Sequence, residues 1–158
     1  ELGKLLDLNS NSKFVHPDLG QFACLGGLWY WLCGDQDDKL RTLCGSKLRY
    51  ECRGYKTHQV EGFHTIIAEA TWYKVIQNQK IIDLMIASDS EMPFKCYYLH
   101  TDLHSAIVHK NNSWYMPILE EIRSVLKKNN DILTAGVTNG KTISPDDLIT
   151  PNFDFVKK

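Results

Sequence analysis

The clearest hydrophobic pattern lies in the middle of the chain, between residues 63 and 86. Apolar residues recur there at intervals of three and four, which is the spacing of one face of an α-helix. The first run comprises Phe63, Ile66, Ile67, Ala70 and Tyr73, and the second comprises Ile81, Ile82, Leu84, Met85 and Ile86. The pattern predicts two helices, and the second ends near Ser88-Asp89-Ser90 because Pro93 cannot continue a helix.

Downstream, the pattern changes from helical spacing to short apolar runs. Residues 94–99 and 106–109 are predicted to be strands that form a hairpin across residues 100–104. An amphipathic helix is then predicted over residues 115–128, with acidic residues early and lysines late, as the helix dipole favours. Residues 129–158 are rich in Thr, Asn, Gly, Asp and Pro, and we expect a loosely structured tail that packs on the domain or leaves it.

The pattern upstream is less regular. Residues 1–13 are predicted to be a leader, which ends in a polar run. Residues 28–33 are an apolar segment whose length does not decide between a helix turn and a strand. Leucines at helical spacing predict a helix over residues 37–50. Together these elements predict a single, mainly helical α+β domain over residues 14–128, with a small β-hairpin or sheet.

Composition places the chain among ordinary globular proteins. Its 158 residues are 43% hydrophobic and 23% charged, which is enough for a substantial core. No apolar run approaches the roughly 18–20 residues that span a bilayer, and the first residues lack the features of a signal peptide. The five cysteines are odd in number and include no C-x-x-C pair, so neither a disulfide framework nor structural zinc is expected. We therefore predict a protein of a reducing compartment, the cytoplasm, with no membrane partner.

Charge is balanced over the whole chain but uneven along it. The net charge of −1 gives no global field that would attract nucleic acid or a membrane. Residues 39–56 nevertheless carry several basic side chains against the single acid Glu51. The basic residues are Lys39, Arg41, Lys47, Arg49, Arg53 and Lys56. This segment is either a solvated basic face or a surface that contacts phosphate or carboxylate groups.

Sequence motifs exclude several well-marked enzyme classes. The chain contains no P-loop, Rossmann glycine fingerprint, H-E-x-x-H or G-x-S-x-G. His100, His104 and His109 lie near Cys96 and raise the alternative of a metal site. Because His100 and His104 flank a turn and no acidic residue supports them, we favour ordinary loop histidines and predict neither a metal nor a cofactor.

Two polar residues interrupt apolar surroundings. Lys74 continues the apolar stripe of the first central helix, so its side chain either reaches solvent at the helix end or points into a pocket. Asp89, in Ser88-Asp89-Ser90, is either part of the turn or the partner of Lys74. The chain is also rich in tryptophan and tyrosine, most of which belong to the core, although one or two are available to stack on a base.

Four short segments, taken in order, carry a family resemblance. The first is Leu19-Gly20-Gln21-Phe22, and the second is the basic stretch from Leu40 to Gly54. The third consists of Ala70, Lys74 and Asn78, spaced four residues apart, with Ala87-Ser88-Asp89 after them. The fourth is Trp114. This order resembles that of the NADAR family of YbiA-type N-glycosidases, over residues 14–126.

The resemblance implies a NADAR-like fold and an N-glycosidase-like activity. The substrate would be a phosphoribosyl or ADP-ribosyl compound, or a nucleic acid that carries ADP-ribose, and the cleaved bond would join ribose to a base. The expected substrate contacts are Arg41, Arg49 and Arg53 for phosphate, and Tyr98 and Trp114 for the base. The expected catalytic residues are Glu69, Asp89 and Lys74. A carboxylate would stabilise the oxocarbenium-like transition state or activate water, with the lysine orienting it.

The sequence also departs from the family pattern at two carboxylates. The family carries a glutamate on its early helix, where this chain has residues 28–31, and an aspartate before the tryptophan, where this chain has Asn111 and Asn112. Either Glu51, Glu69 or Asp89 replaces them, or binding remains without catalysis. Enzymatic activity therefore stays open. The alternatives are a non-catalytic nucleotide- or nucleic-acid-binding module and a viral or phage accessory protein that acts through a protein partner.

Overall fold

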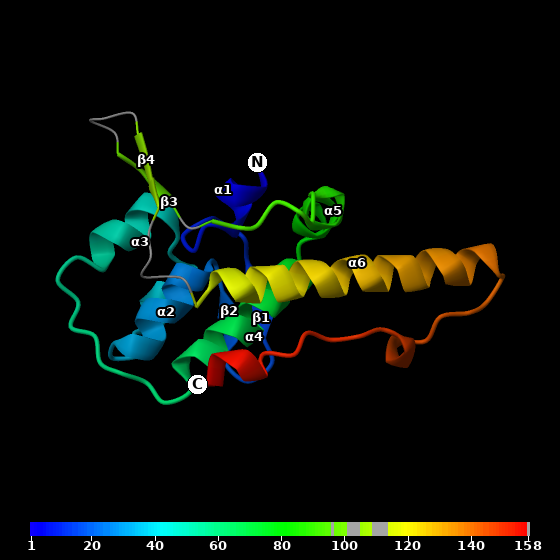
Figure 1. Cartoon of the computed structure of the whole chain (residues 1–158). Coiled ribbons are helices and arrows are strands. Elements are labelled where there is room, and N and C mark those ends of the chain that lie inside the picture. The colour runs from blue at the N-terminus through cyan, green and yellow to red at the C-terminus, as the bar shows by residue number, and fades with distance from the viewer. Residues whose placement is uncertain (96, 101–104, 109–113, 158) are drawn as a thin grey trace. The chain divides into compact units, whose positions relative to one another are not determined.

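The computed structural model describes residues 1–95, 97–100, 105–108 and 114–157 (Figure 1). These residues are mainly helical and include two separate two-stranded antiparallel sheets, which confirms the α+β prediction. The chain forms two compact units, unit 1 (Glu1–Leu84 with Lys157) and unit 2 (Met85–Val156), a division that the sequence pattern did not indicate. None of the described helices has the length and apolar composition needed to cross a membrane.

Unit 1 begins with short elements and ends with the two helices that the sequence predicts most clearly. In order, its elements are α1 (Leu2–Leu6), β1 (Phe14–His16), β2 (Gly20–Phe22), α2 (Leu25–Cys33), the 3-10 helix η1 (Asp38–Thr42), α3 (Gly45–Glu51), α4 (Phe63–Ile76) and α5 (Gln79–Ala87), whose last turn belongs to unit 2. The helix predicted over residues 37–50 is wrong in one respect. The backbone is extended at Leu43 and Cys44, so η1 and α3 are separate helices.

The hairpin of β1 and β2 places two phenylalanines in the core of unit 1. Phe14 lies opposite Phe22 and His16 lies opposite Gly20. Both phenylalanines are buried, and their stacked ring centroids are 6.1 Å apart. Gly20 has a φ of +82°, a conformation that glycine adopts without strain, and it lets the turn lead directly into β2.

Helix α2 contains the apolar segment of residues 28–33, for which the sequence did not decide between a helix and a strand. Cys24 caps the helix, because its Sγ accepts a hydrogen bond from the Gly27 N–H at 3.3 Å. Leu25 and Leu28 are fully buried. A Cβ at Gly27 would lie 2.6 Å from the Leu40 carbonyl oxygen, so the close approach of α2 to η1 requires glycine there.

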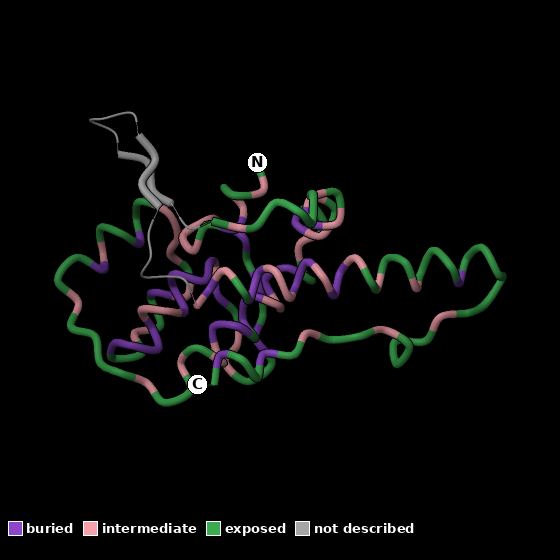
Figure 2. The backbone as a smooth tube through the Cα atoms, in the orientation of Figure 1, coloured by how far each residue is buried: buried purple, intermediate pink, exposed green. Residues whose placement is uncertain are grey.

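Helix α4 is the central element of unit 1 and packs against α2 and β1. Its buried residues are Ile67, Ala68, Ala70, Thr71, Lys74 and Val75. Figure 2 shows that buried positions in unit 1 gather on α2, α4 and the β1–β2 hairpin. The apolar stripe predicted from the sequence is therefore the face that α4 turns into the core, and a lysine lies within it.

Unit 2 contains the second hairpin and one long helix. Strands β3 (Tyr97–His100) and β4 (Ser105–Val108) pair in antiparallel orientation, which confirms the predicted hairpin. Helix α6 (Met116–Thr138) begins close to its predicted start but continues past the predicted end at residue 128. Part of the predicted tail is therefore helical, and two 3-10 helices, η2 (Pro145–Asp147) and η3 (Asp154–Lys157), follow it.

The segment predicted as a leader belongs to the fold of unit 1. Leu6, in α1, and Ser12 are both buried. The Ser10 hydroxyl donates a hydrogen bond to the Leu5 carbonyl oxygen at 2.7 Å. The loop after α1 thus has its own internal order, and it receives further hydrogen bonds from residues far along the chain.

Candidate functional site

Lys74, a predicted catalytic residue, is fully buried in unit 1. Its ammonium donates hydrogen bonds to the Asp7 carbonyl oxygen and to the Ser10 hydroxyl, each at 3.0 Å. Burial lowers the pKa of Lys74 to about 8, because desolvation disfavours the charged form. The side chain therefore does not reach solvent, and both of these hydrogen bonds hold the loop that follows α1.

Two neighbours of Lys74 at the end of α4 act on the same stretch of chain. The Gln77 amide pairs with the backbone of Val15, donating to its carbonyl oxygen and accepting from its N–H, both at 2.8 Å. The Asn78 amide donates to the carbonyl oxygen of Lys13 at 3.3 Å. We call Lys74, Gln77 and Asn78 the α4 clamp, because together they fix residues 7–15 to the end of this helix.

The starts of α2 and α3 complete the hold on the same loop. The Gly26 N–H donates to the Leu8 carbonyl oxygen at 2.7 Å, and the Gly45 N–H donates to the Asn9 carbonyl oxygen at 2.8 Å. Successive carbonyl groups of residues 7–9 thus satisfy donors from three helices. Buried donors need such partners, so this arrangement accounts for Lys74 as a structural residue.

Glu69, the second predicted catalytic residue, lies on a different face of α4 from Lys74. Five residues separate the two, which is a rotation of about 140° around a helix, and the Glu69 side chain is 51% exposed. Its Oε2 atom is 4.0 Å from Nε2 of the buried His16. The predicted orientation of Glu69 by Lys74 is not observed, because the Lys74 ammonium is bonded to the loop after α1.

His16 has a defined tautomer. Its Nδ1 accepts hydrogen bonds from the backbone N–H groups of Asp18 and Leu19, at 3.2 and 3.3 Å. The proton of the neutral ring therefore lies on Nε2. Within the described parts of the chain, this buried Nε2 has no hydrogen-bond partner, and the Glu69 carboxylate is the acid beside it.

Asp89, the third predicted catalytic residue, belongs to unit 2 and is exposed. Its Oδ1 accepts a hydrogen bond from the Glu91 N–H at 2.9 Å, which is the local geometry expected of an aspartate in a turn. Of the two interpretations that the sequence left open for Asp89, this contact matches the turn. Its carbonyl oxygen accepts a hydrogen bond from Arg123 at 2.9 Å.

Arg123 is a residue whose importance the sequence analysis missed. It is buried on α6, and its guanidinium donates to the carbonyl oxygens of Asp89 and Met92. The guanidinium also pairs with Glu120 and lies over the Phe94 ring at 4.5 Å. Arg123 thus holds the loop between α5 and β3. Arg123 lies within the apolar stripe of α6, just as Lys74 lies within the apolar stripe of α4.

Arg41, a predicted phosphate contact, is engaged with unit 1 itself. Its guanidinium lies 4.5 Å from the Phe22 ring centroid and 4.6 Å from that of Trp31. It also donates to the Leu19 carbonyl oxygen at 2.6 Å and to the Asp38 carboxylate at 2.7 Å. These contacts join η1 to α2 and to the β1–β2 hairpin, so the structure uses Arg41 for packing.

Arg49 and Arg53, the other predicted phosphate contacts, are exposed residues of α3 and of the chain just after it. With Lys47 they form a set of exposed cations that make no ion pair in the described residues. The Tyr50 side chain is 73% exposed, and the Arg53 guanidinium is 5.7 Å from its ring centroid. We call Lys47, Arg49, Tyr50 and Arg53 the α3 surface.

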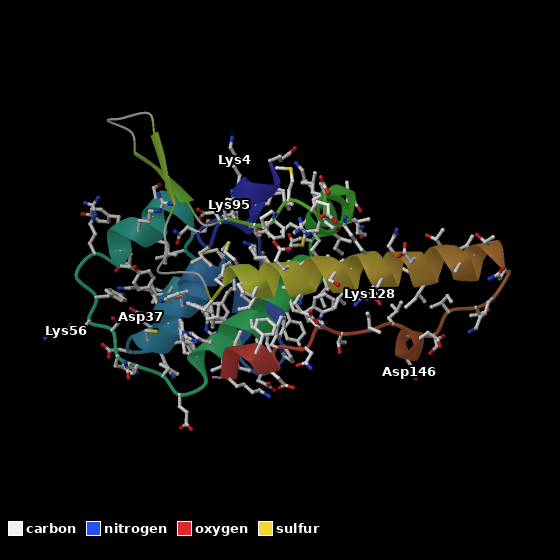
Figure 3. All side chains as sticks on the ribbon, in the orientation of Figure 1. Lys4, Asp37, Lys56, Lys95, Lys128 and Asp146 are labelled. Atoms are coloured by element: carbon white, nitrogen blue, oxygen red, sulfur yellow. The ribbon has the colours of Figure 1, made fainter. Side chains whose placement is uncertain are left out.

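A shallow, open depression of 520 Å³ lies at the α3 surface. It is lined by Leu43, Ser46, Lys47, Tyr50, Glu51 and Arg53. Lys56, on the loop that follows, extends away from the ribbon (Figure 3). The depression therefore combines exposed aromatic area, unpaired positive charge and a hydroxyl group, which is a set of groups that suits an anionic ligand with a flat ring.

The remaining predicted site residues lie in unit 2. Trp114 is partly exposed, and its ring meets that of Tyr115 edge to face at 5.8 Å. The backbone of Tyr98 is part of β3, but its side chain lies outside the description. Cys96, His104 and His109 are outside the described residues, as are Asn111 and Asn112. For His100 only the strand backbone is described. The described part of the chain contains no cluster of metal ligands.

Comparison with known proteins identifies no relative of this chain. No family model matches the sequence, and no curated protein or solved structure matches it.

Proposed function

We propose that the protein is a nucleic-acid-binding module that holds a single strand on the α3 surface. The observation that supports the proposal is Tyr50, a largely exposed aromatic ring that lines one depression together with Lys47 and Arg53. In the described residues these cations have no carboxylate partner, so their charge is available to a ligand. The cations that do have partners, Lys39 and Arg41, are excluded from the binding set.

The chemistry of the surface matches the two groups that every nucleotide offers. A base has a flat π-face that stacks on an exposed tyrosine, and such stacking contributes about 1–3 kcal/mol per base. A phosphate accepts hydrogen bonds from lysine and arginine, and arginine contacts it through two parallel N–H groups. The Arg53 guanidinium lies 5.7 Å from the Tyr50 ring centroid, so the two groups would meet neighbouring parts of one strand.

The shape of the depression favours a polymer over a free small molecule. Sites for small ligands enclose most of the ligand surface, whereas the depression beside Tyr50 is shallow and open. A single strand needs no enclosure, because several nucleotides share the binding energy along an exposed groove. We therefore assign the surface to an extended strand rather than to one nucleotide.

The test is a fluorescence anisotropy titration with a labelled single strand about 12 nucleotides long. Lys47→Glu with Arg53→Glu is expected to weaken binding at least about tenfold, because two phosphate contacts become repulsive. The matched control is Lys4→Glu with Lys13→Glu, which changes the net charge equally at two exposed lysines of unit 1, one on α1 and one just before β1. The control is expected to bind like the wild type.

Two outcomes contradict the proposal. One is a wild-type protein that binds neither single-stranded DNA nor single-stranded RNA, and it would shift the assignment to a protein partner at the same surface. The other is equal weakening by both double variants, because it would show attraction by net charge without a defined site.

We also propose, as the alternative, the NADAR-like fold with N-glycosidase activity that the resemblance implies. The observation that favours it is the exposed Glu69 carboxylate, 4.0 Å from the buried Nε2 of His16. A carboxylate beside an imidazole is suited to activating a water molecule. The test is chromatography of NAD and nucleoside 5′-monophosphates after incubation with the protein. Release of a free base that Glu69→Gln abolishes supports this alternative, and no release from any substrate contradicts it.

A further inference from the structure

One acidic residue lines the depression beside Tyr50. Glu51 is the residue after Tyr50 on α3, and both side chains line the same hollow. The Glu51 side chain is 35% exposed, and its Oε1 lies 2.6 Å from the Lys39 ammonium. A carboxylate repels phosphate, so Glu51 would meet a different group of the ligand.

The Glu51 carboxylate is held in place from one side only. Lys39, which binds Oε1, is itself bound to Asp37 at 3.1 Å, and the Tyr55 hydroxyl donates to the same aspartate at 3.4 Å. This chain of contacts favours one direction of the carboxylate. Among the described residues, no donor is bonded to its second oxygen, Oε2. An acceptor therefore remains beside an exposed aromatic ring.

We infer that Glu51 accepts hydrogen bonds from the edge of a base stacked on Tyr50, and that the α3 surface consequently prefers guanine. The inference rests on the proposed nucleic-acid binding and adds the identity of the base. A carboxylate is only an acceptor, so it selects bases by the donors on their exposed edge.

The four bases differ clearly in those donors. Guanine presents two neighbouring donors, the ring N1–H and the exocyclic amino group. The carboxylate accepts one at Oε2 and the other at Oε1, whose second lone pair is not used by Lys39. Adenine and cytosine each present an amino group next to a ring nitrogen that accepts hydrogen bonds. Thymine and uracil present one N–H between two carbonyl oxygens, which repel a carboxylate. The expected order of affinity is therefore guanine first, adenine and cytosine next, and thymine or uracil last.

The experiment compares oligothymidylate with strands in which one central thymidine is replaced by guanosine, adenosine or cytidine. Wild-type protein is expected to bind the guanosine strand about tenfold more tightly than oligothymidylate, the effect of one bidentate contact. Glu51→Gln, which replaces one acceptor oxygen by a donor, is expected to reduce that ratio to about threefold or less. Glu61→Gln, at an exposed position of unit 1, is the control and retains the full ratio.

The results distinguish the guanine preference from the proposed single-strand binding on which it rests. Binding of all four strands with equal affinity overturns the guanine preference and leaves single-strand binding intact. A guanine preference that survives in Glu51→Gln also overturns the inference, because another residue then reads the base. Absence of binding to every strand overturns single-strand binding and the preference together.

Discussion

Lys74 and the cations of the α3 surface carry the same charge in opposite surroundings within unit 1. The Lys74 ammonium is fully buried and has two oxygen partners from the chain itself. Lys47, Arg49 and Arg53 are exposed and form no ion pair in the described residues. The difference indicates a division of roles. A buried cation that is hydrogen-bonded to the chain orders the fold, whereas one that is exposed and unpaired remains available to a ligand.

Unit 2 also contains a buried cation that is hydrogen-bonded to the chain, and here it is an arginine. Arg123 is buried and donates to backbone carbonyl groups of the loop between α5 and β3, as Lys74 does for the loop after α1. Unlike Lys74, Arg123 also has a carboxylate partner, Glu120. Both units therefore use one buried cation to order an irregular segment, and only Arg123 has its charge balanced by an acid.

The largest expected effect is on stability when Lys74 is truncated. Lys74→Ala leaves a cavity and removes the donor for the Asp7 carbonyl and the Ser10 hydroxyl. We expect a loss of about 3 kcal/mol in the free energy of unfolding, measured by urea denaturation. The comparison is Lys47→Ala on α3, an exposed site where a change within about 0.5 kcal/mol is expected. Equal losses at the two positions would remove the distinction.

A somewhat smaller loss is expected at Arg123. Arg123→Lys keeps the charge but loses the planar fork that contacts Met92 and Asp89 together. The expected destabilisation is about 2–3 kcal/mol, which is the effect of unpairing buried polar groups. Thermal unfolding monitored by circular dichroism would measure it. Arg53→Lys serves as the matched exchange at an exposed position, and there the unfolding temperature should not change.

At the α3 surface, the expected effect is on binding and not on stability. Tyr50→Ala should weaken binding of a single strand by about 2 kcal/mol, because a stacking platform is lost. Tyr50→Phe retains the ring and should bind nearly as well as the wild type. Isothermal titration calorimetry on the three proteins would measure the differences. Tight binding by Tyr50→Ala would show that the ring does not contact the strand.

The smallest expected effect is the pH dependence that Lys74 contributes. Its pKa is lowered from 10.5 to about 8 in the folded protein, so at intermediate pH the unfolded chain binds more protons. The contribution of Lys74 to stability therefore rises with pH, by about 1–2 kcal/mol between about pH 8 and pH 9.5.

The pH effect must be measured as a difference between two proteins. Burial raises the pKa of the Cys24 thiol, so its effect on stability over this range has the opposite sign. The quantity to follow is the free energy of unfolding of the wild type minus that of Lys74→Met, which retains Cys24. A difference that stays constant or falls as pH rises would contradict the lowered pKa.

The sequence predicted those parts of the fold that depend on local periodicity. The repeats from Phe63 to Ile86 gave α4 and α5, and the pattern after Tyr115 gave the start of α6. The end of α6 was missed because its last turns lack the apolar stripe that packing against a core would require. The interruption between η1 and α3 was missed because the leucine spacing continues across it.

The candidate site was only partly predictable, for a related reason. The sequence singled out Lys74 because a lysine interrupts an apolar stripe, but its partners are a backbone carbonyl and a hydroxyl more than sixty residues away. Any residue can supply a carbonyl group, so such partners leave no mark in a sequence. Arg49 and Arg53 were selected by charge, whereas the exposure of Tyr50 follows from how α3 is placed and was not predictable.

The most direct test of the division between structural and ligand-binding cations compares two variants. The dissociation constant of a labelled single strand is measured for each variant under conditions where that variant is folded. Lys74→Ala should bind the strand like the wild type, despite its lower stability. Lys47→Glu with Arg53→Glu should bind at least about tenfold more weakly, despite wild-type stability. The opposite pattern, with binding lost in Lys74→Ala and retained in the α3 variant, would contradict the account.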